Sequence, residues 1–325
     1  MKHILVIKLG ALGDMFAATS AFEAIRNHHK HAHLTLLTTK LYKDFAEQLG
    51  YFDDVWLDDR SKLRRLRSVW DLRKKLRSNS FDRVYDLQMV DRTNFYFHLL
   101  GPGRRPEWVG TALGASHRYH LPKVPTYHQD RLKSLLARAD INPLPPLNLT
   151  RLAKNIQTFP VKFPYVLFAP GASKAHRLTK CWPLERYAEV ATTLVKAGLT
   201  PIIIGGADEN NHLITAICPE AIDLTGKTNL MDVITLATHA AFAIGNDTGP
   251  MHIAATCLCP VLVLFFETHD PNTVGPRGVF YRHLKAQDKT ALPSSTILQV
   301  LPEFIEKFKD RKFHPLLIST SHTLS

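Results

Sequence analysis

At 325 residues the chain is long for a single hydrophobic core, and two domains of about 150 residues each are expected. Its composition, 45% hydrophobic and 22% charged, is that of a soluble globular protein. An excess of 41 Lys and Arg over 29 Asp and Glu gives a net charge of +12. This charge favours an anionic partner: nucleic acid, anionic lipid or a phosphorylated substrate.

The cysteines and the apolar runs indicate a cytoplasmic protein. The four cysteines form neither a C-x-x-C pair nor a zinc-binding spacing, so buried free thiols in a reducing compartment are expected. Lys8 and Asp14 interrupt the apolar run near the N-terminus, which argues against a signal peptide. The longest apolar run, residues 258–266 with Pro260 inside it, is too short to span a bilayer.

In the first half of the chain, short apolar runs alternate with helical patterns. Strands are expected at residues 3–7, 33–38, 55–57 and 83–87, with a weaker candidate at 108–110. A glycine-rich turn over residues 8–14 follows the first strand, and residues 15–27 are expected to form one helix. The alternation predicts an open parallel sheet with right-handed crossovers.

Between these elements, residues 60–77 combine many Lys and Arg with apolar residues at helical spacing. Two interpretations stay open: a solvated helix with one apolar stripe, or a surface that contacts anionic lipid or a phosphorylated acceptor. Arg104 and Arg105 add to this basic character of the first domain.

A proline-rich stretch from residue 140 to 164 has little periodicity and predicts an interdomain linker. After it the alternation restarts, with strands expected at 165–169, 201–204, 223–224, 240–244 and 261–265, and helices at 184–197, 209–217, 230–237 and 296–308. We therefore predict an acceptor-side domain over residues 1–150, a linker over 151–164, a second domain over 165–312, and a loose tail over 313–325.

The stretch after the strand at residues 240–244 is a candidate anion site. A polar turn leads into an alanine-rich helix with Pro250 in its first turn, where a missing N–H costs little. Asp247 or Thr248 is expected to cap this helix, and Gly249 lets the backbone approach a ligand. Alone, the stretch fits an ordinary capped turn, although a helix N-terminus beside a flexible turn is also suited to an anion.

Other ligand classes fit less well. The turn at Gly10 and Gly13 lacks the G-x-G-x-x-G spacing of nicotinamide-binding proteins, and no Walker lysine pattern is present. Asp14, Lys180 and His252 each also have an ordinary structural explanation, as a helix-dipole acid, a surface lysine and a core histidine. Their placement on successive turns of two halves is what favours a ligand-binding cleft.

The sequence resembles glycosyltransferase family 9, the heptosyltransferases of the lipopolysaccharide inner core. The matching segments, in family order, are residues 7–14, 169–172, 180–183, 204–206, 224–228 and 246–252. The resemblance implies a GT-B architecture, with two Rossmann-like α/β domains whose parallel sheets face a central cleft. It also implies inverting transfer of a heptose from an ADP-heptose donor, with neither metal ion nor cofactor, to a phosphorylated, lipid-linked glycan acceptor.

The same resemblance implies roles for individual residues. Asp14 would be the general base, and Lys180 would stabilise charge on the departing ADP. The backbone amides of Thr248 and Gly249 would hold the phosphates, and Asp247 would bind sugar hydroxyls. The other predicted donor-binding residues are Ser173, Asp208 (or Glu209) for the ribose or sugar, Gly226, Lys227 and Thr228 at the adenine edge, and His252; Gly10 and Gly13 form the acceptor-side loop.

Two alternatives remain. Cys181 stands where family members often have a basic or bulky polar residue, so a GT-B transferase for another nucleotide-sugar is possible on sequence grounds. A non-catalytic nucleotide- or nucleic-acid-binding protein is the second alternative. Intact Asp14, Lys180 and Asp247 argue against lost catalysis, and no interleaved basic-aromatic platform favours nucleic acid. The basic first domain favours a peripheral location on the cytoplasmic face of the inner membrane.

Overall fold

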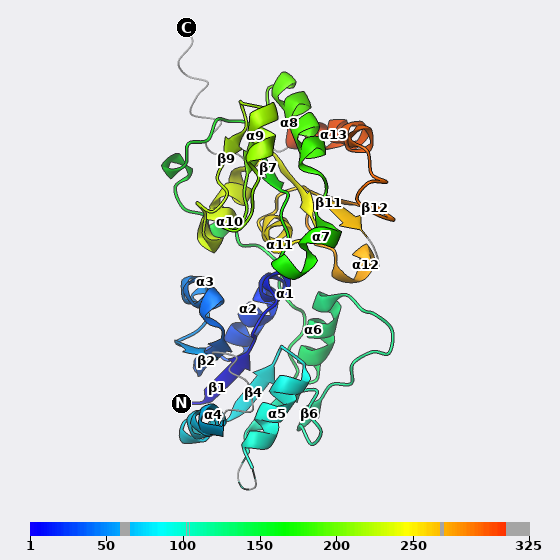
Figure 1. The fold of residues 1–325 in the computed structure, drawn as a ribbon. Helices are drawn as coiled ribbons and strands as arrows, with labels where there is room; N and C mark the ends of the chain where they lie inside the picture. Colours follow the sequence, from blue (N-terminus) through cyan, green and yellow to red (C-terminus); the bar gives the residue numbers. More distant parts are fainter. Residues whose placement is uncertain (59–65, 102, 104, 267–269, 310–325) are drawn as a thin grey trace. The chain divides into compact units, whose positions relative to one another are not determined.

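The computed structural model describes residues 1–58, 66–101, 103, 105–266 and 270–309. The chain divides into two compact units, Met1–Leu147 and Asn148–Ser325 (Figure 1). Part of the predicted basic segment (residues 60–65), Arg104 and the predicted tail at 313–325 lie outside the described residues.

The first unit is built on a parallel sheet. Its strands are β1 (His3–Ile7), β2 (His33–Thr38), β3 (Asp54–Leu57), β4 (Arg83–Asp86), β5 (Glu107–Gly110) and β6 (His117–Arg118). They are ordered β3-β2-β1-β4-β5-β6, so the chain reverses its direction of travel across the sheet between β1 and β4. In such sheets a ligand binds beyond the carboxyl ends of the strands at this topological switch point.

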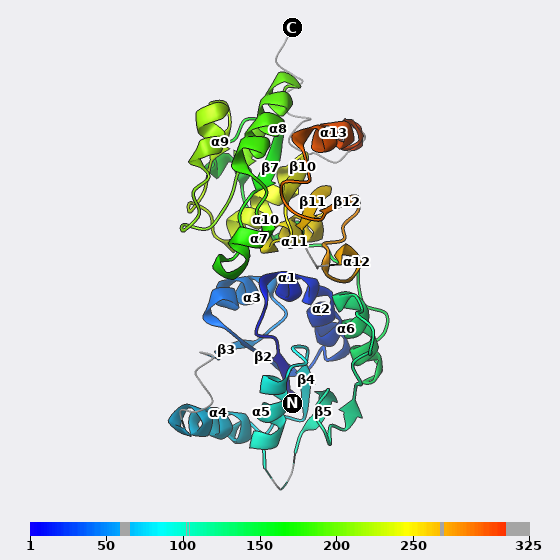
Figure 2. The same ribbon diagram turned by 45° about the vertical axis from the view of Figure 1, so that its right-hand side comes forward.

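Helices cover both faces of this sheet. They are α1 (Leu12–Ala17), α2 (Thr19–His28), α3 (Lys43–Leu49), α4 (Leu66–Ser78), α5 (Asp91–Leu99) and α6 (His128–Ala137), with the 3-10 turn η1 (Lys40–Tyr42). Figure 2 shows α2 and α6 on one side of the sheet and α4 and α5 on the other. On the latter side, Leu5 and Ile7 of β1 share a buried cluster with Leu76 of α4 and Tyr96 of α5.

The single helix expected over residues 15–27 is two helices. The first begins earlier, at Leu12, and ends at Ala17; the N–H of the C-cap residue, Ala18, bonds back to the carbonyls of Asp14 and Met15. Thr19 then donates its hydroxyl to the carbonyl of Phe16 at 2.7 Å, a local bond that competes with a continuous helix. This break leaves α1 as a short separate helix that carries Asp14 in its first turn.

The second unit repeats the topology of the first. Its strands are β7 (Tyr165–Ala169), β8 (Thr200–Ile203), β9 (Ile222–Asp223), β10 (Phe242–Asn246), β11 (Val261–Phe266) and β12 (Tyr281–Ala286). They are parallel and ordered β12-β11-β10-β7-β8-β9, which places the switch point between β7 and β10.

The helices of the second unit are α7 (Arg177–Lys180), α8 (Leu184–Lys196), α9 (His212–Ile217), α10 (Leu230–His239), α11 (Gly249–Thr256), α12 (Pro271–Val274) and α13 (Ser294–Lys309), with the 3-10 turns η2 (Thr150–Leu152), η3 (Ile156–Thr158) and η4 (Lys174–His176). A cluster of Leu194, Ile214 and Phe304 packs α8, α9 and α13 onto Phe242 of β10. Residues before β7 also pack here: the N–H of Leu149 bonds to the carbonyl of Thr256 at 2.9 Å.

The predicted fold class, α/β with two Rossmann-like parallel sheets, is confirmed. The weaker strand candidate at residues 108–110 is part of β5, whereas β6, β12, α3, α5 and α6 were not predicted. The predicted cleft between the sheets stays a prediction. Within the described ranges, no helix has both the length and the apolar character that crossing a bilayer requires.

Candidate active site

Asn246, the last residue of β10, ties together the segments that meet at the switch point of the second unit. It is fully buried, and its amide nitrogen donates to the carbonyls of Pro170 and Gly171 in the turn after β7. Its amide oxygen accepts from the N–H of Trp182 and the hydroxyl of Tyr187, both at 3.1 Å. A buried amide satisfied on both ends fixes these segments in one arrangement.

The next residue, Asp247, forms the central ion pair of this unit. Lys180 Nζ donates to Asp247 Oδ2 at 2.6 Å, and the two side chains are only 16% and 10% exposed. His252 Nε2 lies 3.9 Å from the other carboxylate oxygen. Burial by itself would raise the pKa of Asp247, but the contacts with His252 and Lys180 outweigh burial and lower the pKa. Asp247 is therefore a carboxylate at neutral pH and a poor proton acceptor.

The cap of α11 differs from the expectation. Thr248 is the N-cap residue, but its side chain makes no capping hydrogen bond. The Thr248 hydroxyl oxygen is buried, without a hydrogen-bond partner in the part of the chain that the structure describes. Asp247 does not cap the helix either, because its carboxylate is taken up by Lys180. The start of α11, at Gly249, thus keeps its positive dipole end for another anion.

Asp208 and Glu209, after β8, lie in different surroundings. The Asp208 carboxylate accepts from Arg177 Nη2 at 2.9 Å, lies 3.7 Å from Lys174 Nζ, and is 43% exposed. The hydrogen bond from Arg177 lowers the pKa of Asp208. Asp208 is thus paired with two cations, Lys174 and Arg177. Ser173, which directly precedes Lys174, is the N-cap residue of η4 and is exposed.

Glu209 instead fills the space above two glycines. A Cβ added at Gly171 would lie 1.8 Å from Glu209 Oε2, and one at Gly205 would lie 2.4 Å from the same oxygen. Asn211 Nδ2 is 3.5 Å from that oxygen, and burial raises the pKa of Glu209. Glycines at both turns are therefore required for this carboxylate to reach the switch point.

The turn after β9 lies against the turn after β8. Gly226 has a φ of +71°, which favours glycine, and its N–H donates to the carbonyl of Gly205 at 2.9 Å. Lys227 Nζ bonds to the carbonyl of Asp223 at 3.1 Å, and Thr228 is half-buried. The structure thus places these three predicted donor-binding residues beside the glycine turn that holds Glu209.

In the first unit, the loop after β1 crosses the switch point. Gly10 has a φ of +120°, and the N–H of Leu9 bonds to the side-chain oxygen of Gln88, after β4, at 2.9 Å. Gly13 and Asp14 follow in the first turn of α1. The Asp14 side chain is 43% exposed, so its carboxylate is open to solvent and to a substrate.

Behind Asp14 lies a buried polar group. Lys8 is fully buried; its Nζ donates to the carbonyl of Leu87 at 3.3 Å and lies 3.4 Å from His128 Nε2. Burial lowers the pKa of Lys8 to about 8. His128, at the start of α6, places Nδ1 3.7 Å from Asp14 Oδ1. The pKa of the equally buried Asp86 is raised by burial to about 6.

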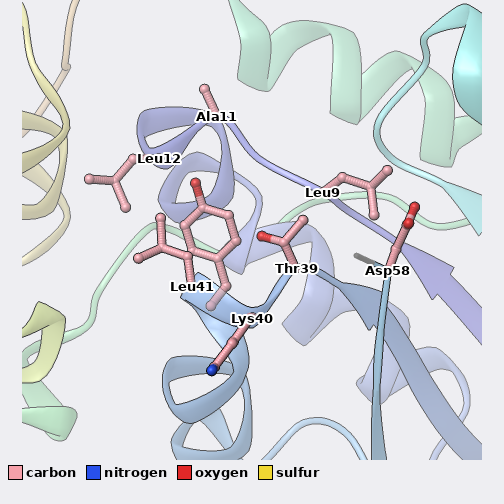
Figure 3. Close-up of a pocket in the computed structure, with 8 residues that line it drawn as sticks. Leu9, Ala11, Leu12, Thr39, Lys40, Leu41 and Asp58 are labelled. Carbon is pink, nitrogen blue, oxygen red and sulfur yellow. The ribbon is translucent and has the colours of Figure 1, made fainter. Parts of the chain in front are cut away.

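A cavity of about 470 Å³ opens beside this loop, at the carboxyl ends of β1, β2 and β3. Its lining residues are Leu9, Ala11, Leu12, Thr39, Lys40, Leu41, Tyr42 and Asp58. In Figure 3, Leu12 and Leu41 lie at the opposite end from Leu9 and Asp58. Asp58 accepts hydrogen bonds from Arg92 and Tyr96, so its carboxylate is held at the edge of the cavity.

Comparison with known proteins assigns the chain to a family. The model of glycosyltransferase family 9 (heptosyltransferase) matches residues 69–303, which is more than half of the chain. The chain belongs to glycosyltransferase family 9. The lipopolysaccharide core heptosyltransferase OpsX of Haemophilus influenzae is 24% identical over 294 residues, 85% of this chain and 82% of its own length.

Solved structures agree on the fold of this family 9 glycosyltransferase. The ADP-heptose lipopolysaccharide heptosyltransferase II of Escherichia coli has a TM-score of 0.76 at 20% identity, with 95% of this chain and 100% of that one covered. Escherichia coli heptosyltransferase WaaC, solved with ADP, has a TM-score of 0.73 at 15% identity. The match covers 93% of this chain and 99% of the WaaC chain. The GT-B fold class is thereby confirmed.

Within the second unit, the structure brings Lys180, Asp247 and His252 together, with Thr248 and Gly249 adjacent. The sequence patterns assign no role to Asn246, Lys8 or His128. Asn246 lies in the matching segment at residues 246–252, whereas Lys8 and His128 lie 120 residues apart and meet only in the folded chain. In the described ranges, no group of three or more His, Cys, Asp or Glu could hold a metal ion, and metal-independent transfer stays a prediction.

Proposed function

We propose that this family 9 glycosyltransferase transfers a heptose from an ADP-heptose donor to the lipopolysaccharide inner core or a related glycan, with inversion at the anomeric carbon and without a metal ion. The observation that carries the proposal is the contrast between two carboxylates. Asp247 is paired with Lys180 at 2.6 Å, whereas Asp14 is 43% exposed on the loop beside the cavity of the first unit.

In this mechanism Asp14 is the general base. An acceptor hydroxyl attacks the anomeric carbon as its proton passes to the Asp14 carboxylate. The bond from the anomeric carbon to the diphosphate oxygen breaks, and its electron pair leaves with ADP. Attack from the side opposite the leaving group inverts the anomeric configuration. The cavity lined by Leu9, Leu12 and Lys40 would hold the acceptor sugar next to Asp14.

The second unit would bind the donor. Lys180 has two further N–H donors besides the one that Asp247 accepts, and these would neutralise the charge that develops on the departing diphosphate. The backbone N–H groups of Thr248 and Gly249 and the dipole of α11 would bind the same phosphates. Asp247 would then use its remaining lone pairs for heptose hydroxyls.

For the ribose of ADP, we assign Glu209 in preference to Asp208. Glu209 lies over Gly171 and Gly205, at the turns after β7 and β8, whereas Asp208 is engaged by Arg177. A carboxylate in a glycine-lined site accepts two adjacent ribose hydroxyls well. The adenine would lie along residues 226–228, next to this site.

The test of the donor is calorimetry with ADP, UDP and GDP, followed by a transfer assay with ADP-heptose and heptose-deficient lipopolysaccharide. ADP should bind at least about tenfold more tightly than UDP, a difference of about 1.4 kcal/mol. Clear preference for UDP would refute the ADP-heptose assignment and favour the alternative, a GT-B transferase for another nucleotide-sugar.

We also propose that the first unit contacts the cytoplasmic face of the inner membrane through α4. Trp70 on this helix is 64% exposed, and Arg73 Cζ lies 5.3 Å from the centre of its ring. Exposed Trp beside cations suits the interface of an anionic bilayer.

Binding to vesicles of phosphatidylglycerol and phosphatidylethanolamine should weaken with salt and with Trp70→Ala. Lys74→Gln should weaken it more than Lys75→Gln, since Lys74 is exposed and Lys75 Nζ lies 4.4 Å over the Trp56 ring. Binding that is insensitive to salt and to Trp70→Ala would contradict this contact.

A further inference from the structure

The two nitrogens of the His128 ring have different neighbours. At Nε2, the Nζ of buried Lys8 lies 3.4 Å away. At Nδ1, Asp14 Oδ1 lies 3.7 Å away, while Arg131 Nη2, one turn along α6, lies 3.3 Å away. A neutral imidazole carries one ring proton, so it can satisfy only one arrangement of these neighbours at a time.

The charge on Lys8 decides which arrangement is possible. An ammonium only donates, so a charged Lys8 requires Nε2 to accept and leaves the ring proton on Nδ1, facing the Asp14 carboxylate. A neutral Lys8 amine can accept from Nε2–H, and Nδ1 is then free to accept from Arg131, which only donates. In the second arrangement Asp14 loses its histidine donor.

We propose that His128 is a positioning residue for Asp14, and that the proton on buried Lys8 selects the His128 tautomer that donates to the Asp14 carboxylate. The donated proton engages Oδ1 and leaves the other oxygen of Asp14 for the acceptor hydroxyl. The contact of 3.7 Å is long for a hydrogen bond. Catalytic hydrogen bonds are commonly long in the absence of substrate and shorten in the substrate complex. The proposal rests on the role of Asp14 as general base.

The charges around Lys8 make its proton responsive to pH. It is faced by Asp14 on α1, Asp86 at the end of β4, and His128 and Arg131 on α6; the two carboxylates favour the ammonium, whereas Arg131 and burial disfavour it. Since burial lowers the pKa of Lys8 to about 8, the ammonium predominates at neutral pH and the amine at higher pH. The Asp14-facing tautomer is thus the neutral-pH form.

The direct test needs no substrate. In the full-length protein labelled with ¹⁵N-histidine, long-range ¹H–¹⁵N spectra report which ring nitrogen carries the proton, and the signals that disappear in His128→Asn identify His128. We expect the proton on Nδ1 near pH 7 and on Nε2 at higher pH, with a midpoint at the pKa of Lys8, about 8. Lys8→Met, which removes the ammonium at similar volume, should hold the proton on Nε2 throughout.

Arg131→Met is the matched control, because it removes the competing donor at Nδ1 and leaves Lys8 in place. The proton should then stay on Nδ1 to higher pH than in the wild type. A His128 proton that stays on Nε2 near neutral pH, or a tautomer shift that Lys8→Met leaves unchanged, would overturn the proposal whether or not ADP-heptose is the donor.

Kinetics test the consequence for transfer. An asparagine amide can donate near the position of Nδ1, whereas a glutamine amide lies near Nε2. His128→Asn should therefore keep a kcat at least about tenfold above that of His128→Gln, with the KM for donor nearly unchanged. The loss of kcat at alkaline pH should be absent in His128→Asn, whose amide has no tautomer to change.

Equal kcat values and equal pH profiles for the two variants would mean that His128 is only structural, and would overturn the positioning role. If instead Asp14→Asn keeps full turnover while the tautomer responds to Lys8 as expected, the assignment of Asp14 as base fails and the Lys8–His128 coupling stands. The two outcomes are distinguishable because the spectra require no reaction.

Discussion

The two units share one sheet order but hold their switch-point carboxylates in opposite ways. In the second unit, Asp247 is 10% exposed and paired with Lys180 at 2.6 Å. In the first unit, Asp14 is 43% exposed, and the nearest lysine of the loop, Lys8, is buried and bonded to Leu87 and His128 instead. The same topology therefore supplies one carboxylate that is kept ionised and one that is open to an incoming proton.

The contrast between the two carboxylates follows from the direction of a lysine side chain in each unit. Lys180, at the end of α7, engages Asp247 and helps to lower its pKa, which in the proposed mechanism suits Asp247 to donor binding. A lysine that points inward from the loop after β1 leaves the carboxylate accessible and acts on it through a histidine. In the proposed mechanism, the direction of one lysine side chain therefore decides whether the carboxylate binds the donor or accepts a proton.

Asp14→Asn should produce the largest effect. Losing a general base lowers the rate by roughly 10²-fold to 10⁴-fold, and since Asp14 lies outside the donor unit, the Kd for ADP should change by less than about twofold. Steady-state transfer and calorimetry measure the two quantities. Asp247→Asn is the matched control, for which donor affinity should fall; turnover retained in Asp14→Asn would remove the distinction between the carboxylates.

Lys180→Met should weaken ADP binding by roughly 10-fold to 100-fold, because charge-assisted hydrogen bonds contribute about 1.5–3 kcal/mol each. It also leaves Asp247, whose side chain is 10% exposed, without its lysine partner, so the unfolding midpoint should fall. The double variant Lys180→Met/Asp247→Asn should recover stability but not affinity. Wild-type ADP affinity in Lys180→Met would contradict the phosphate role.

Gly171→Ala should act through Glu209. The added Cβ would lie 1.8 Å from Glu209 Oε2, so the carboxylate must move away. We expect a loss of about 1–3 kcal/mol in the free energy of unfolding and a roughly tenfold weaker ADP affinity. In a double-mutant cycle with Glu209→Ala, the stability cost of Gly171→Ala should largely vanish; additive costs would mean that Glu209 does not occupy this space.

The two units should also differ in how their stability depends on pH, with opposite signs for Asp86 in the first unit and Asp247 in the second. The pKa of Asp86 is raised from 3.8 to about 6, so its folded form binds a proton more tightly than its unfolded form, and stability falls by up to about 3 kcal/mol as pH rises across this window. The pKa of Asp247 is lowered from 3.8 in the folded protein. Ionised Asp247 therefore stabilises the fold above pH 3.8, and this contribution is lost as the pH falls through the folded-state pKa.

Urea unfolding between about pH 3 and pH 7 measures this difference. The stability of Asp86→Asn relative to the wild type should increase between about pH 4 and pH 6, whereas the deficit of Asp247→Asn should shrink below about pH 4. The same sign of pH dependence for both variants would show that the two carboxylates do not differ in the way described.

Much of the architecture follows from local sequence. Continuous apolar runs such as residues 3–7 and 261–265 predict strands buried on both faces, and these match β1 and most of β11. Elements with weak patterns were missed: β6 has only two residues, and β12, at the sheet edge, has only exposed and half-buried positions. No position of β12 is buried, so hydrophobic periodicity indicates such an edge strand poorly.

The sequence by itself determined the two α/β halves, the turns that carry the candidate residues and the motif at residues 247–252, because these depend on local periodicity and glycine placement. Only the tertiary structure decided that Lys180 faces Asp247, that Glu209 fills the site over Gly171, and that Lys8 contacts His128. These pairings join residues 67, 38 and 120 positions apart. The direction of a side chain at a turn is set by the strands that pack beside it, and no local pattern encodes those neighbours.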